Sequence, residues 1–138
     1  MIIPNLMVTD MERSIAFYRD VLGLKVAFTI DGSRDMTSEG VGKGAVFATL
    51  EWEGSQLMLQ TVGSLAEEVP GIDADQAPGV GGTVYFRGMD PRSVRERVPK
   101  EAVQKGPERA WYGMLELYLR DPDGHVVCLG IPEGPAPG

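Results

Sequence analysis

The chain has 138 residues, of which 43% are hydrophobic and 24% charged, and its formal net charge is −7. These values are typical of one globular domain over residues 1–138 and exclude a disordered chain. The acidic balance argues against nucleic acid as a partner, because nucleic-acid-binding proteins normally present a basic face. One cysteine permits no intramolecular disulfide, the first ten residues lack the basic start of a signal peptide, and no apolar run approaches the roughly 20 residues that span a bilayer. We therefore expect a cytoplasmic protein that does not interact with membranes.

The first half of the chain predicts a strand, a helix and three further strands. An apolar strand over residues 2–8 is followed by Thr9 and Asp10, either of which can cap a helix. Apolar residues then recur at helical spacing until Gly23, which is suited to end the helix. The later elements are a strand over 24–30, a mobile glycine-rich loop over 31–44, and hairpin strands over 45–52 and 55–62 that turn at Glu53-Gly54. A Gly-, Pro- and Asp-rich linker over 63–82 completes this half.

The second half repeats the same order of elements. After a strand over 83–88, Asp90 can cap a short helix with Pro91 at its first position. The expected elements that follow are a weak strand over 102–107, a strong strand over 110–121, a DPDG turn and a strand over 125–131. The repeated order indicates an internal duplication, with modules over 1–63 and 83–131 and a flexible tail over 132–138.

Three stretches of the chain carry a family resemblance: MVTDMERSIAFYRDVLGLKV (7–26), LMLQ (57–60) and WYGMLELYLRDPDGHVVCLG (111–130). With these stretches the sequence resembles the vicinal oxygen chelate superfamily, which includes glyoxalase I, extradiol dioxygenases, fosfomycin-resistance enzymes and bleomycin-resistance proteins. The resemblance implies an α+β fold in which two tandem βαβββ modules form an open, curled barrel-like sheet with a ligand groove. It also implies a homodimer whose two-fold partner closes the groove. It does not settle the function, because one fold hosts many chemistries.

Alternation along the strands assigns side chains to a core face and a groove face. Leucines and valines at every second position suit the core, and their neighbours are left for the groove. The predicted groove residues are Met7, Gln56, Met58, Gln60, Tyr85, Trp111, Tyr112, Met114, Glu116 and Cys128. Thioethers and flat aromatic rings adapt to varied planar ligands, although any one of these side chains could simply fill space.

Metal-dependent members of the superfamily bind their ion through His and Glu on these strands. By the resemblance, the four ligand positions fall near Ile3, Gln56, Thr83 and Cys128. Moving each position by two residues, which keeps the face, gives Asn5, Met58, Tyr85 and Val126. Neither set supplies the convergent nitrogen, carboxylate or thiolate donors that a divalent ion needs. We therefore expect no metal, no cofactor and no catalytic residue of that type.

Several side chains keep two interpretations. His125 is either a turn residue or a ligand, and Cys128 is either a small packed hydrophobe or a nucleophile. The stretch WYGMLE resembles the family's WGMRE, with Leu115 in place of the arginine, which puts an anionic ligand in doubt. Glu116 keeps the acid and can pair either with a ligand cation or with Arg87.

The predicted function is metal-independent binding of a small aromatic molecule in a groove at a dimer interface. The acidic net charge of the protein would suit a cationic ligand. Bleomycin-resistance proteins, which this chain resembles, sequester a drug in this way. One alternative is a glyoxalase-type lyase, isomerase or dioxygenase with a diverged metal site. Another is a regulatory or structural dimer with a vestigial groove.

Overall fold

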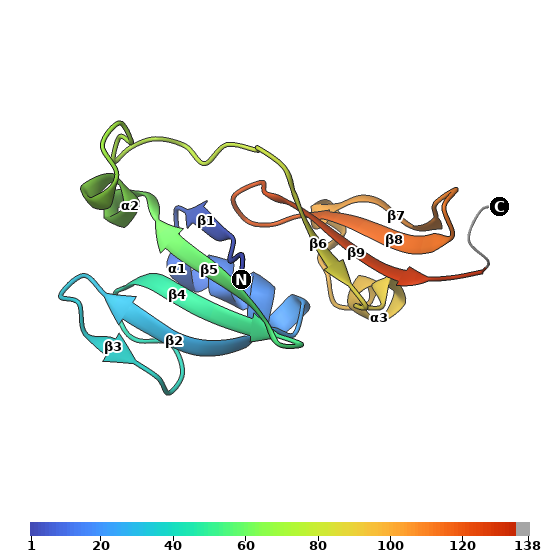
Figure 1. The fold of residues 1–138 in the computed structure, drawn as a ribbon, viewed down its shortest axis with the longest axis horizontal. Helices are drawn as coiled ribbons and strands as arrows, with labels where there is room; N and C mark the ends of the chain where they lie inside the picture. Colours follow the sequence, from blue (N-terminus) through green and yellow to red (C-terminus); the bar gives the residue numbers. More distant parts are fainter. Residues whose placement is uncertain (135–138) are drawn as a thin grey trace. The chain divides into compact units, whose positions relative to one another are not determined.

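A computed structural model describes residues 1–134 and divides the chain into two compact units, Met1–Pro78 and a second unit that begins at Gly79 (Figure 1). Each unit has its own sheet. The tail predicted over 132–138 overlaps the last strand at Pro132, and its residues 135–138 lie outside the described part. No helix in residues 1–134 is long and apolar enough to cross a membrane.

The first unit contains a five-stranded sheet in the order β1-β5-β4-β2-β3. Its strands are β1 (Asn5–Val8), β2 (Lys25–Asp31), β3 (Met36–Thr37), β4 (Ala45–Trp52) and β5 (Ser55–Thr61). Its helices are α1 (Met11–Ala16), the π-helical η1 (Phe17–Val21) and α2 (Val62–Glu68). β1 pairs with β5 in parallel, and the other neighbours are antiparallel.

The predicted first helix forms with its cap at Asp10, whose side chain accepts a hydrogen bond from the backbone N–H of Arg13 at 3.1 Å. Its second half is a π-helix in which Leu22 N–H bonds to the Phe17 carbonyl at 3.2 Å. Apolar spacing did not reveal this π-helical turn, because apolar residues at helical spacing indicate a helix without giving its hydrogen-bond pattern. Gly23 follows with φ 82°, as its predicted role at the helix end requires.

Two short elements lie where the sequence predicted only loop or linker. β3 pairs with β2 inside the glycine-rich segment, and its two residues are too few to produce a periodic signal. α2 occupies the start of the predicted linker, where Thr61 accepts a hydrogen bond from Ser64 N–H at 3.4 Å and so caps the helix. Gly63 in its first turn lowers helix propensity, which concealed this helix from sequence analysis. The hairpin turn at Glu53 and Gly54 is confirmed, with φ of 48° and 77°.

The second unit contains a four-stranded sheet in the order β6-β9-β8-β7. Its strands are β6 (Thr83–Arg87), β7 (Val103–Arg109), β8 (Met114–Arg120) and β9 (Val126–Pro132). Its helices are α3 (Pro91–Arg95) and the 3₁₀ turn η2 (Lys100–Ala102). β6 pairs with β9 in parallel, so this unit repeats the edge pairing of β1 with β5.

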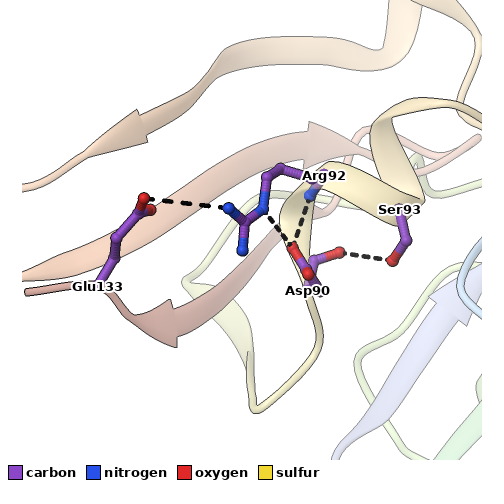
Figure 2. A network of polar contacts seen from close by, with 4 residues as sticks. All are labelled: Asp90, Arg92, Ser93 and Glu133. Atoms are coloured by element: carbon purple, nitrogen blue, oxygen red, sulfur yellow. Dashed lines mark hydrogen bonds and ion pairs between the residues drawn. The ribbon is translucent and has the colours of Figure 1, made fainter.

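The predicted cap of α3 is confirmed. Asp90 accepts a hydrogen bond from Arg92 N–H at 2.9 Å (Figure 2). Pro91 stands in the first turn of α3. The Ser93 hydroxyl donates to the Asp90 carbonyl at 3.0 Å, and the Arg92 guanidinium lies 3.3 Å from Asp90 and 4.0 Å from Glu133 (Figure 2). These ion pairs are solvent-exposed and therefore contribute little to stability. The network fixes the start of α3.

The strand predicted over 110–121 is shorter than expected. Residues 110–113 form a turn, in which Gly113 N–H donates to the Ala110 carbonyl at 3.0 Å and Gly113 has φ 88°. Trp111 and Tyr112 therefore belong to this turn and not to β8. At the other end of β8, Asp121 accepts from Asp123 N–H at 2.9 Å and from His125 N–H at 2.8 Å, which builds the predicted DPDG turn.

Candidate functional site

The second sheet separates its two faces as the alternation predicted. Leu117 and Leu119 on β8 and Val127 and Leu129 on β9 are fully buried, on the side where α3 contacts these strands. On the opposite side the register pairs Tyr118 with Cys128, Cys128 with Tyr85, and Glu116 with Gly130. We call this opposite side the tyrosine face; it carries Tyr85, Glu116, Tyr118, Arg120, Cys128 and Gly130.

The centre of the tyrosine face is the carboxylate of Glu116, whose residue is only 3% exposed. Its Oε2 accepts a hydrogen bond from the Tyr85 hydroxyl at 2.6 Å, and its Oε1 accepts one from the Tyr112 hydroxyl. Within the described residues Glu116 forms no ion pair with Arg87, so that interpretation is wrong. Glu116, Tyr85 and Tyr112 form one unit, which we call the tyrosine–carboxylate cluster.

The absence of a side chain at Gly130 leaves the space that the Tyr85 ring occupies in this cluster. A Cβ atom at Gly130 would lie 2.0 Å from the Tyr85 hydroxyl oxygen and 2.8 Å from the adjacent ring carbon. The Tyr85 ring therefore passes over β9 at the one position without a side chain, and so reaches Glu116 on β8. Sequence analysis missed Gly130; the available signal was a glycine inside an apolar strand, which often marks a close approach.

Burial and the carboxylate of Glu116 raise the pKa values of Tyr85, Tyr112 and Cys128. Burial and the bond to Glu116 raise the pKa of Tyr85, and for Tyr112 the bond to Glu116 is the larger cause of a raised pKa. Burial, followed by the charge of Glu116, raises the pKa of the Cys128 thiol to about 11. The two hydroxyls are therefore hydrogen-bond donors at neutral pH, and the thiol is protonated, the form that is a weak nucleophile.

The other predicted residues of this unit occupy different surroundings. Cys128 is fully buried, with its Sγ 3.8 Å from the Leu129 carbonyl oxygen, in agreement with a packed small side chain. Met114 is buried as well. Trp111 is 80% exposed and its ring meets that of Tyr112 edge to face at a centroid distance of 5.4 Å. The indole therefore stands at the rim of the cluster.

The groove residues predicted in the first unit lie together on one face of its sheet. The register pairs Asn5 with Met58 and Met7 with Gln60. Gln60 is 3% exposed; its Oε1 accepts from the Asn5 side chain at 2.9 Å and its Nε2 donates to the Ser64 hydroxyl at 3.0 Å. This amide is thus engaged in linking β1, β5 and α2.

A hollow of about 560 Å³ adjoins Gln60 in the first unit. Its lining residues are Ile30, Asp31, Gly32, Arg34, Val46, Phe47, Gln60, Thr61, Gly63, Ser64, Glu67 and Glu68. Of the predicted groove residues only Gln60 lines this hollow, whereas Gln56 lies at the opposite end of β5 beside Glu51.

Comparison with known proteins shows the family. The model of the Glyoxalase/Bleomycin resistance protein/Dioxygenase superfamily matches residues 3–129. The chain belongs to this superfamily. The family and the α+β fold predicted from the sequence are thereby confirmed. No curated protein sequence gives a significant match.

Solved structures of the superfamily share the fold at low identity. A protein of unknown function from Agrobacterium tumefaciens is 26% identical with a TM-score of 0.72, the match covering 95% of this chain and 92% of that one. A lactoylglutathione lyase from the same organism is 21% identical with a TM-score of 0.63 and the same coverage. TnmS3, an antibiotic binding protein from Streptomyces sp. CB03234, is 20% identical with a TM-score of 0.62, covering 95% and 93%. Identities this low show the fold and leave the activity open.

The side chains at the superfamily's metal-ligand positions do not fit a divalent ion. In residues 1–134, no three His, Cys, Asp or Glu side chains gather closely enough to hold one. Cys128 keeps its proton well above neutral pH, and both oxygens of Glu116 already accept hydrogen bonds from tyrosines. A superfamily reaction that runs through a bound metal therefore has no donor set here, and metal independence stays a prediction.

Proposed function

We propose that this superfamily member is a metal-independent binding protein that sequesters a planar aromatic molecule, with or without positive charge, in a groove at a homodimer interface. The observation that supports this proposal is the tyrosine–carboxylate cluster. It holds two tyrosine rings in fixed positions while leaving Tyr85 42% and Tyr112 37% exposed. Rigid, exposed aromatic rings are the side chains best suited to hold a planar ligand.

The carboxylate acts on the ligand through the two phenols. Because both of its oxygens accept tyrosine hydroxyls, Glu116 is better placed to orient the rings than to pair directly with a ligand cation. A phenol that donates to a carboxylate has a more electron-rich ring, which strengthens stacking and cation–π contacts on its exposed face. The exposed indole of Trp111 beside Tyr112 extends the same aromatic surface. Glu116 is therefore a positioning residue in this proposal.

A protein with this fold is described as an antibiotic binding protein, namely the Streptomyces structure. At 20% identity, its ligand-binding residues cannot be transferred to this chain, but its description indicates which compounds to test first. The first panel consists of planar aromatic antibiotics and dyes in cationic, neutral and anionic forms. Binding is measured by isothermal calorimetry after a thermal-shift screen.

The decisive variant is Glu116→Gln. We expect it to weaken a bound aromatic compound about tenfold, equivalent to about 1.4 kcal/mol. The amide is uncharged, and the nitrogen that replaces one carboxylate oxygen donates instead of accepting, so the two phenols are oriented less firmly. The control is Glu101→Gln, which makes the same chemical change at an exposed site on η2. A spectrophotometric titration of the tyrosines distinguishes positioning from general destabilisation, since a released phenol ionises at lower pH than a phenol bound to Glu116.

Two results would refute the proposal. One is a Glu116→Gln protein with lowered stability and altered tyrosine titration but unchanged affinity, which would leave the cluster as scaffold. The other is the absence of binding by every planar compound in the panel.

A further inference from the structure

A second hollow, of about 340 Å³, lies on the tyrosine face of the second unit. We call it the basic hollow; its lining residues are Gln104, Lys105, Tyr118, Arg120 and Val126. The lining contains two cations and no carboxylate, in a chain whose net charge is −7. No local sequence pattern predicted this hollow, because its lining residues come from three strands.

The guanidinium of Arg120, which lines the basic hollow, is held by two contacts. Nη1 donates to the Gly124 carbonyl at 2.7 Å, and Nε lies 3.5 Å from the Gln104 side-chain oxygen. Nη2 has no bond within the described residues and retains two donors. A half-buried guanidinium held in this way loses little further freedom when it binds a carboxylate or sulfonate.

Lys105 supplies the second positive charge of the lining. Its Nζ lies 3.1 Å from Glu108 and 5.9 Å from the centre of the Tyr118 ring. The bond to Glu108 is the main cause of a raised pKa, so the amine stays charged at neutral pH. The pair with Glu108 is exposed and therefore weak, which leaves Lys105 available to a ligand anion.

The order of side chains along β8 relates the basic hollow to the tyrosine–carboxylate cluster. Glu116, Tyr118 and Arg120 follow one another on the same face, separated by two residues each. Consecutive side chains on one face of a strand lie about 7 Å apart. The tyrosine face thus presents an acid, an aromatic ring and a base in sequence over about 14 Å.

We infer that the basic hollow is an anion subsite, and that the aromatic ligand carries a carboxylate, sulfonate or phosphate group that binds Arg120 and Lys105 while its ring system lies over the tyrosines. This inference rests on the proposed function and makes its ligand class narrower. Leu115 stands where the family has an arginine, which had put binding of an anionic ligand in doubt. Lys105 and Arg120 supply positive charge for an anion from other positions.

The test uses two fluorescent probes that share one ring system. Anilinonaphthalene sulfonate carries an anion, and phenylnaphthylamine is the same molecule without the sulfonate. We expect the sulfonate to bind the native protein at least about tenfold more tightly than its parent. Lys105→Gln and Arg120→Gln should each remove most of this difference and leave the affinity for phenylnaphthylamine unchanged. Lys100→Gln, an equal loss of charge on exposed η2, should change neither affinity.

Arg120 also supports the DPDG turn through Gly124, so its loss could loosen the fold. Lys105→Gln, in which the altered side chain is solvent-exposed, keeps the test valid if Arg120→Gln is unstable. Equal affinity for the two probes, or a preference for the sulfonate that survives Lys105→Gln, would overturn the anion subsite alone. Failure of both probes to bind would overturn the proposed function together with the subsite.

Discussion

Replacing Gly130 by alanine tests whether the tyrosine–carboxylate cluster depends on the gap in β9. The new Cβ would lie 2.0 Å from the Tyr85 hydroxyl oxygen, far inside ordinary contact distance, so the ring must move and its bond to Glu116 must break. A hydrogen bond to a charged group contributes about 1.5 to 3 kcal/mol. Because Tyr85 is 42% exposed, water can replace it as a donor to Glu116. We therefore expect the free energy of unfolding to fall by an amount near the lower limit of this range.

The assay is urea unfolding combined with a double-mutant cycle. In a Tyr85→Ala background nothing occupies the space above Gly130, and we expect Gly130→Ala to cost there less than about 0.5 kcal/mol. The control is Gly81→Ala, at a glycine whose added Cβ meets no atom within 4 Å and whose φ is not positive. In Gly130→Ala, the released Tyr85 should also ionise at lower pH than in the wild type. An equal cost of Gly130→Ala in both backgrounds would show that Tyr85 does not depend on this gap.

Four further predictions concern the thiol, the metal and the assembly. The Cys128 pKa of about 11 exceeds its ordinary value of 9.0, so between these pH values the native state keeps a proton that the unfolded state releases. The free energy of unfolding should therefore fall as pH rises from 9 to 11, by at most about 1.4 kcal/mol per pH unit. In Cys128→Ala this fall should be less steep. A thiol reagent at pH 8 should react with Cys128 slowly in native protein and rapidly in urea, and equal rates would contradict its burial. Protein purified without an affinity tag should contain no stoichiometric metal by elemental analysis, and chelator-sensitive binding of the aromatic ligand would oppose this. Light scattering should find a homodimer, whereas a monomer at micromolar concentration would remove the proposed interfacial groove.

Local sequence patterns predicted every described strand except the two-residue β3, the helices α1 and α3, a cap at Thr9 or Asp10, the cap at Asp90 and the core faces of the strands. Asp10 and Asp90 cap their helices and Glu53-Gly54 turns the hairpin because these are local interactions between residues that are close in the chain. Strand alternation likewise has a period of two, so the buried leucines of β8 could be separated from Glu116 without knowledge of any partner strand.

Which groups meet on the tyrosine face depends on how the strands pair. Tyr85, Glu116 and Gly130 belong to three strands, and their contact depends on the register of β6, β8 and β9 across the sheet. The partner of Glu116 could not be chosen from the sequence, because Arg87 and Tyr85 alternate to the same face and only the path over Gly130 favours the tyrosine. The register between distant strands and the space above a glycine arise when the strands pack, so a local pattern of residues cannot predict them.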